Sequence, residues 1–301
     1  MKKLEDIRIL VIGDIMLDKY VVTEVNRISP ESPVPIAEVI EEYSNLGGAG
    51  NVVKNIRDLG VQVDCLASVG KDDNGKIISR KLNNLSIGDY LINESEITIV
   101  KERIVANSRK IQMLRIDREI IKKIHPDIII EKLKDYFTNH SPDIIIVSDY
   151  AKGLINNEVM LYLKEQAYKI IVDPKPQHAP YYEGVFMITP NEKEWKEMEL
   201  SSQFNLNNVK YILETKGKHG MSLKDFNQSW EIPAEEAHAV YNLSGAGDTV
   251  IAMMGVCLSL GINSIKSAKI ANTCAAYVVT KPDTSTVPKE LFLKTIKENR
   301  G

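Results

Sequence analysis

Residues 7–14 read IRILVIGD, an apolar run rich in branched side chains that ends in Gly13 and Asp14. A short, continuous apolar run of this kind is typical of a strand that is buried on both faces of a sheet. We therefore predict that it forms the first strand of an α/β protein. Its carboxyl end carries an aspartate.

Similar apolar runs recur along the chain, at residues 61–70, 143–150, 169–173 and 185–190. Helical patterns lie between them, at residues 47–60 and 72–85, from about residue 127, at residues 158–167 and from residue 191. Alternation of strands and helices predicts a doubly wound, mostly parallel sheet with helices on both faces. We expect one domain that covers residues 1–301.

Two segments do not fit this sheet, at about residues 18–42 and 96–117. In both, apolar and polar residues alternate, which is typical of strands with one solvated face. The second segment turns near Asn107 and Ser108, so we expect a hairpin there. Together the two segments predict a small antiparallel β lid inserted in the domain.

Composition narrows the class of protein. The chain has 301 residues, 44% of them apolar, and a formal net charge of −3. This composition predicts a globular protein and argues against a dedicated nucleic-acid binder. No apolar run is long enough to insert in a membrane, and the amino end is interpreted as a strand rather than a signal peptide. The three scattered cysteines favour reduced, buried thiols in a cytoplasmic protein.

Two glycine-rich stretches could carry chemistry: LGGAGN at residues 46–51 and SGAGD at residues 244–248. Each precedes a helical pattern, so backbone N–H groups and a helix N-terminus would meet at one point and favour an anion. Asp248 lies in the first turn of the second helix. Each stretch alone is equally compatible with an ordinary turn and helix cap.

Polar residues follow several of the predicted strands. Open parallel sheets bind ligands at the carboxyl ends of their strands, so these residues predict a ligand site there. They are Asp14, Asp18, Asp149, Asp173, Lys175 and Asn191.

GGAGN and SGAGDT resemble the two signatures of the ribokinase-like (PfkB) carbohydrate kinases, and the resemblance covers essentially the whole chain. Within this family the chain is most similar to the heptose 7-phosphate kinases of lipopolysaccharide-precursor synthesis. The stretches that carry this similarity are GDIMLDKY, RISPESPVPI, SDYAKG, VDPK, ITPNEKE and TSTV. Many relatives are fused to a nucleotidyltransferase with an HxGH motif, which this sequence lacks. The resemblance therefore implies a stand-alone kinase.

The resemblance also implies roles for individual residues. Asp248 would be the catalytic base, and the N–H groups of Gly245, Ala246 and Gly247 would form the anion hole. The positions that match the sugar site are Asp14, Gly47, Gly48, Asn51, Asp149 and Asp173. A sugar phosphate also needs cationic partners. The candidates are Lys101, Arg103, Arg115, Lys152 and Lys175, each of which could instead be an ordinary surface charge.

On the nucleotide side, the resemblance implies ATP and Mg²⁺ as cofactors. Asn191 and Glu194 reproduce an NxxE pattern associated with Mg²⁺, which the resemblance implies is contacted through waters. Either residue alone could equally be a helix cap or a solvated side chain. The remaining positions that match the ATP site are Thr215, Lys216, Gly217, Gly220, Ser244, Asn272, Ala275 and Ala276.

Three positions depart from the family pattern. Asn242 stands where relatives usually carry Asp, and Asp283 where they commonly carry Gly, so a requirement for K⁺ stays open. Pro176 replaces a usual Gly next to Lys175, which bears on the exact substrate.

We expect phosphorylation of the anomeric hydroxyl of D-glycero-D-manno-heptose 7-phosphate by ATP. A kinase for another sugar or sugar phosphate is an alternative, and so is a non-catalytic sensor of sugar phosphate or nucleotide. An exposed lid with an apolar face also predicts a homodimer.

Overall fold

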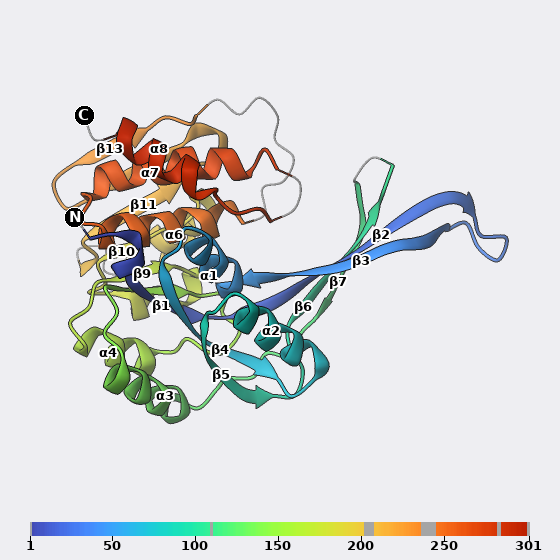
Figure 1. The fold of residues 1–301 in the computed structure, drawn as a ribbon, viewed down its shortest axis with the longest axis horizontal. Coiled ribbons are helices and arrows are strands. Elements are labelled where there is room, and N and C mark those ends of the chain that lie inside the picture. The colour runs from blue at the N-terminus through green and yellow to red at the C-terminus, as the bar shows by residue number, and fades with distance from the viewer. Residues whose placement is uncertain (1, 109–110, 202–207, 236–244, 282–283, 300–301) are drawn as a thin grey trace.

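The structure is a computed structural model that describes residues 2–108, 111–201, 208–235, 245–281 and 284–299 (Figure 1). Its larger sheet has the strand order β13-β12-β11-β10-β9-β8-β1-β4-β5. These strands are β1 (Arg8–Gly13), β4 (Gln62–Gly70), β5 (Gly88–Ser95), β8 (Ile144–Ser148), β9 (Ile170–Asp173), β10 (Met187–Ile188), β11 (Tyr211–Thr215), β12 (Met221–Lys224) and β13 (Ser229–Ile232).

In this sheet β5, β4, β1, β8, β9, β10 and β11 run parallel to one another. Strands β12 and β13 continue the sheet beyond β11, and each runs antiparallel to its neighbour. The helices are α1 (Ala49–Asp58), α2 (Asp73–Asn84), α3 (Pro126–Asn139), α4 (Asn157–Glu165), α5 (Glu192–Glu199), α6 (Ala246–Ser259), α7 (Ser264–Val278) and α8 (Lys289–Glu298). A doubly wound, mostly parallel sheet flanked by helices confirms the predicted fold class.

Strand β1 explains why its sequence is apolar without alternation. Ile9 and Val11 pack in a core that includes side chains of α1, α2, α6, α7 and α8. Leu10 and Ile12 pack in a second core, with side chains of α3, α4 and α5. Successive residues of a strand point to opposite faces, so a strand between two helical layers must be apolar on both.

A second sheet has the order β3-β2-β6-β7 and projects from the body as a long arm (Figure 1). Its strands are β2 (Ile15–Ile28), β3 (Pro35–Gly48), β6 (Val100–Ala106) and β7 (Ile111–Arg118). It is the small sheet predicted as the lid, and we keep that name for it. β2 and β3 are antiparallel, as are β6 and β7, but β2 and β6 pair in parallel. The parallel pair follows from connectivity, because β2 and β6 follow two parallel strands, β1 and β5, through short connections.

Cys65, Cys257 and Cys274 are all buried free thiols, as expected. Among the described residues, no helix combines the length and the hydropathy that crossing a bilayer would take.

We expect Gly13→Ala to destabilise the fold, because a Cβ there would lie 2.1 Å from the Ser148 carbonyl oxygen on the neighbouring strand β8. Overpacking of this kind costs about 1–3 kcal/mol or more in the free energy of unfolding, which urea titration measures. Gly247→Ala is the matched control, because an added Cβ there meets no described atom within 4 Å. Equal unfolding midpoints for the two variants would contradict this packing.

Candidate active site

Three aspartates lie at the carboxyl ends of adjacent strands. Asp14 follows β1, Asp149 follows β8, and Asp173 ends β9. The backbone fixes this alignment, since Asp14 N–H donates to the Ser148 carbonyl and Asp149 N–H donates to the Asp173 carbonyl, both at 3.1 Å. The structure therefore brings three of the predicted strand-end carboxylates together at one edge of the sheet. Asp18, which was predicted there too, lies instead within lid strand β2, because the chain enters that strand directly after Asp14.

The two glycine-rich stretches meet above this edge. Asn51 lies in α1 and donates from Nδ2 to Asp248 Oδ2 at 2.8 Å, although the two residues are 197 positions apart. Asp248 lies in the first turn of α6 and is only 6% exposed. Gly245 caps α6 with φ of +84°, and a Cβ there would come within 2.7 Å of Asn51 Nδ2. A glycine is therefore required where the two stretches touch.

The start of α6 has the features of an anion site. Ala246 and Gly247 begin the helix, and the first intrahelical amide bond in this turn is from Thr249 N–H to the Gly245 carbonyl at 2.9 Å. Amides of a first helical turn have no acceptor within the helix and carry the positive end of its dipole. Ser244 and Asn242, which precede this turn, and Asp283 lie outside the described residues.

The predicted sugar-side glycines are sites of close approach. A Cβ at Gly47 would lie 2.4 Å from Asp18 Oδ2. Gly48 has φ of +58°, and a Cβ there would lie 2.5 Å from the Asp14 carbonyl oxygen. The chain can turn from β3 into α1 beside the Asp18 carboxylate and the Asp14 carbonyl only because both positions lack side chains.

Asp14 and Asp149 organise the loop after β8. Asp14 Oδ2 accepts from Tyr150 N–H at 2.9 Å and from Lys152 N–H at 3.0 Å. Asp149 is fully buried and accepts from Ala151 N–H, His178 Nδ1 and the Tyr182 hydroxyl at 2.6–2.7 Å. Burial, with the nearby Asp149 charge, raises the pKa of Asp14 to about 6.

Tyr150 is a site residue that the sequence reasoning did not identify. Its hydroxyl donates to Asp248 Oδ1 at 2.9 Å, and its ring lies 5.3 Å from the Lys175 ammonium and 5.7 Å from that of Lys101. The available signal was its position in SDYAKG, directly after the strand-end Asp149. Nothing local in the sequence indicated that its side chain would reach Asp248.

The five candidate cations differ in their surroundings. Arg103 pairs with buried Asp18 at 2.6 Å, Lys152 with Glu119 at 2.8 Å, and Arg115 with Asp117 at 2.9 Å. Lys175 contacts Glu194. Lys101 has no ion-pair partner in the described part of the chain, and burial lowers its pKa. Lys101 is thus a partly buried cation near Asp248 that an anionic ligand could pair with.

Asn191 and Glu194 form a capping box at the start of α5. Asn191 Oδ1 accepts from Glu194 N–H at 3.0 Å, and Glu194 Oε2 accepts from Asn191 N–H at 3.1 Å. With Lys175 on its other oxygen, Glu194 is already neutralised. Among the described residues, no group of three His, Cys, Asp or Glu side chains is arranged to hold a metal ion. The pair fits contact with a metal-bound water better than direct ligation.

The predicted nucleotide residues lie around the end of β11 and on α7. Thr215 ends β11, and Lys216 N–H donates to the Gly220 carbonyl at 2.8 Å across the turn that contains Gly217. A pocket of about 600 Å³ is lined in part by Asn191, Thr215, Lys216 and Gly217. On α7, buried Asn272 donates to the Pro233 carbonyl at 2.8 Å, and Ala275 and Ala276 lie one turn further on. Asn272 therefore holds the segment after β13.

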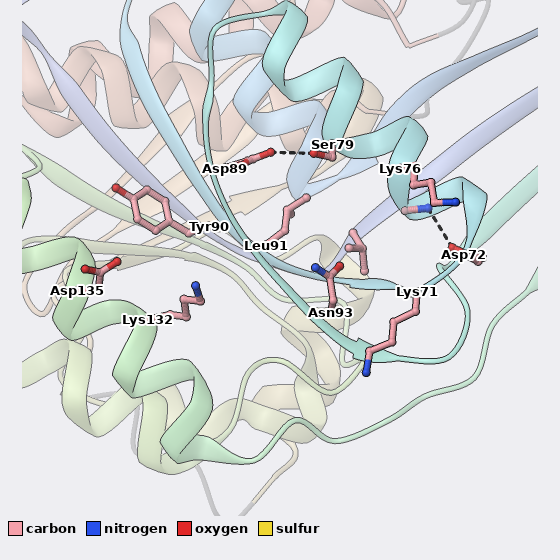
Figure 2. A pocket seen from close by; sticks show the side chains of 13 residues that line it. Lys71, Asp72, Lys76, Ser79, Asp89, Tyr90, Leu91, Asn93, Lys132 and Asp135 are labelled. Carbon is pink, nitrogen blue, oxygen red and sulfur yellow. Dashed lines mark hydrogen bonds between the residues drawn. The ribbon is translucent and has the colours of Figure 1, made fainter.

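Figure 2 shows a different pocket, of about 690 Å³, between β5, α2 and α3. Its lining mixes lysines and aspartates, and Ser79 donates to Asp89 across it at 3.0 Å. Asp248 and the strand-end aspartates are not part of it. Its lining carries as many lysines as aspartates and includes no residue of the two glycine-rich stretches, so we place the chemistry at the strand ends instead.

Burial is the main influence on Asp248, and it raises the pKa of that carboxyl. Hydrogen bonds from Asn51 and Tyr150 act in the opposite direction. Burial also raises the pKa of Asp173 well above its usual value, and the neighbouring Asp248 charge adds to this. The site therefore contains a buried carboxylate, held by two donors, beside a helix N-terminus. This arrangement can remove a proton from a hydroxyl next to a bound anion.

Comparison with known proteins agrees with this chemistry. Residues 6–290 match the profile of the pfkB family carbohydrate kinases. The bifunctional protein HldE of Desulfatibacillum aliphaticivorans is 36% identical over 93% of the chain, and that of Campylobacter jejuni is 35% identical over 91%. The chain spans 61% of the length of both relatives.

Solved structures share the fold. Phosphofructokinase-2 of Escherichia coli, in a complex with potassium, superposes with a TM-score of 0.81 over 98% of this chain and 100% of its own, at 14% identity. Ribokinase of Thermotoga maritima gives a TM-score of 0.72 over 97% of this chain and 99% of its own, at 20% identity. The profile match spans nearly all of the sequence, and the chain belongs to the pfkB family of carbohydrate kinases.

Proposed function

We propose that the chain transfers the γ-phosphoryl group of ATP to the anomeric hydroxyl of D-glycero-D-manno-heptose 7-phosphate and so forms the 1,7-bisphosphate. The observation that carries this proposal is the meeting of Asp248 with the strand-end carboxylates and the start of α6. The similarity to HldE proteins supports the heptose substrate. The product would serve the synthesis of nucleotide-activated heptose for surface polysaccharide.

Asp248 acts as the base in this proposal. Its burial raises its pKa, so it accepts a proton from the sugar hydroxyl more readily than an exposed aspartate would. The N–H groups of Gly245, Ala246 and Gly247 stabilise the charge that develops on the transferred group. Asn51 contacts Asp248, and Asp14 contacts the Tyr150 backbone; in this proposal both hold sugar hydroxyls.

The 7-phosphate requires cations within reach of the same site. Lys101 is the strongest of the five candidates, because it has no carboxylate partner among the described residues. Lys175 faces the same Tyr150 ring, but it also pairs with Glu194. The other three, Arg103, Arg115 and Lys152, already pair with carboxylates, and they would have to exchange or share these partners.

ATP occupies the β11 and α7 side in this proposal, next to Thr215, Lys216 and Gly217. Mg²⁺ would neutralise phosphate charge, and its waters would donate to Glu194. A role for K⁺ stays open, because the two positions that bear on it lie outside the described residues.

Several large apolar side chains of the lid are exposed to water, which is energetically unfavourable. They are Val25, Ile28, Val34, Val39, Ile40, Ile111, Met113 and Leu114. We propose that a second copy of the chain covers them, forming a homodimer whose lids close over the sugar. Exclusion of water from the site would limit hydrolysis of ATP.

The first prediction concerns transfer from Mg·ATP to a panel of heptose 7-phosphate, fructose 6-phosphate, sedoheptulose 7-phosphate, ribose and adenosine. We expect turnover of heptose 7-phosphate alone, and a loss of about 10²–10⁴-fold in kcat for Asp248→Asn, because general-base catalysis contributes that much. Asp127→Asn, an exposed aspartate on α3, is the control and keeps full activity. Turnover of another sugar of the panel instead would assign the kinase a different substrate. Binding of ATP and sugar without any turnover would favour the alternative of a non-catalytic sensor.

The second prediction concerns pH. The pKa of Asp14 is raised to about 6, so this carboxylate takes up a proton as the pH falls through that value. A neutral carboxyl accepts hydrogen bonds from sugar hydroxyls less well than a carboxylate does, so we expect KM for the sugar to rise below pH 6. Initial rates between pH 5 and 8 measure this. In Asp14→Asn the rise should disappear and KM should be high throughout; an unchanged pH profile in this variant would assign the titration to another group.

The third prediction concerns assembly. We expect sedimentation equilibrium at micromolar concentration to give a dimer, and Val39→Glu combined with Leu114→Glu to give a monomer, because two charges would be buried in an apolar contact. Leu161→Glu introduces the same charge at an exposed apolar residue of α4 and should stay dimeric. A monomeric wild-type protein would refute the proposed dimer.

A further inference from the structure

We infer that Tyr150 is a positioning residue that orients the Asp248 carboxylate and keeps it ionised, an inference that rests on the proposed function, in which Asp248 is the base. Tyr150 itself transfers no group. Its contribution is a hydrogen bond and a fixed place in the site.

Two donors from different elements hold the two oxygens of Asp248. Tyr150, in the loop after β8, donates to Oδ1 at 2.9 Å, and Asn51 of α1 donates to Oδ2 at 2.8 Å. One donor on each oxygen fixes the plane of the carboxylate. Donation to a charged acceptor also favours the ionised form over the protonated form. Both effects suit a base that must stay deprotonated while it is buried.

Hydrogen bonds of the backbone at Tyr150 and Ala151 fix the position of the Tyr150 side chain. Its N–H donates to Asp14 Oδ2 at 2.9 Å, and Ala151, with φ of +55°, donates to Asp149 Oδ1 at 2.7 Å to close the turn. The ring packs beside Gly48, where an added Cβ would lie 3.4 Å from Tyr150 Cε2. The phenol therefore occupies one position that is set by the same Asp14 that we assign to the sugar.

The charged groups around Asp248 come from several elements. Asp18 of β2 and Asp173 of β9 disfavour its ionised form, whereas Lys101 of β6 favours it. Burial also disfavours the ionised form of Asp248. Asn51 and Tyr150 are the two neutral donors that oppose it. Burial and the Asp248 charge raise the pKa of Tyr150 well above its usual value, so the phenol keeps its proton and remains a donor.

These contacts predict what Tyr150→Phe changes. The substitution keeps the ring, its packing beside Gly48, the two lysine contacts and the backbone bond to Asp14. It removes only the hydroxyl. The pKa of Asp248 should therefore rise, while the sugar side of the site keeps its structure.

Carbon-13 NMR of protein labelled at the aspartate carboxyl carbons tests this on the free protein, with Asp248→Asn to assign the resonance. In Tyr150→Phe we expect the pKa of Asp248 to rise by about one unit, since a hydrogen bond to a charged group is lost. The control is Tyr136→Phe, which removes a 2.9 Å tyrosine–aspartate bond to Asp64, away from the site. An Asp248 pKa that is the same in Tyr150→Phe as in the wild type would overturn the inference.

Kinetics give a second readout. Tyr150→Phe should lower kcat about tenfold at pH 7 and move its acid limb to higher pH, with KM for the sugar within about twofold of the wild type. A purely structural role would lower the amount of active protein and leave the acid limb in place, which would also overturn the inference. If the wild type phosphorylates no sugar, the proposed function fails, and the NMR titration still decides the role of Tyr150.

Discussion

The hydrogen bond between Asn51 and Asp248 joins the two glycine-rich stretches, and the geometry of the site depends on it. The bond is possible only where α1 and α6 begin side by side, and Gly245 must lack a side chain for that approach. The strands then provide the opposite wall, because parallel strands end at one edge. Positions far apart in the sequence thus become neighbours through the topology of the sheet.

The strand-end carboxylates destabilise one another in this arrangement. Asp14, Asp149, Asp173 and Asp248 lie close enough that burial and mutual repulsion raise the pKa of Asp14 and Asp173. Backbone amides, Tyr150, Tyr182, His178 and Lys175 offset this by donating to the charged oxygens or lying beside them. Buried charges that persist at such a cost are typical of functional sites. The proposed role of these carboxylates in binding a polyhydroxylated sugar and a phosphoryl group would explain why the fold keeps them.

Much of this could be predicted from the sequence. The buried parallel strands, the helices that begin at Ala49 and Ala246, and the strand-end aspartates follow from apolar runs and from glycine positions, which are local signals. The contacts of Tyr150 could not be predicted, because they depend on a tertiary approach to a residue 98 positions away. Strand β5 and the antiparallel pair β12 and β13 also escaped prediction. Of these, β5 and β13 are the edges of the sheet, and edge strands need not be apolar on both faces. The parallel pairing of β2 with β6 could not be predicted either, because it depends on where β1 and β5 end in the larger sheet.

We propose that the site around Asp248 phosphorylates an anomeric hydroxyl. Phosphorus-31 NMR of the product formed from heptose 7-phosphate and Mg·ATP tests it most directly. We expect a second phosphomonoester signal that couples to the anomeric proton, with one ADP formed for each phosphoryl group transferred. A new phosphate on any other carbon, or ADP formed together with free phosphate alone, would contradict it.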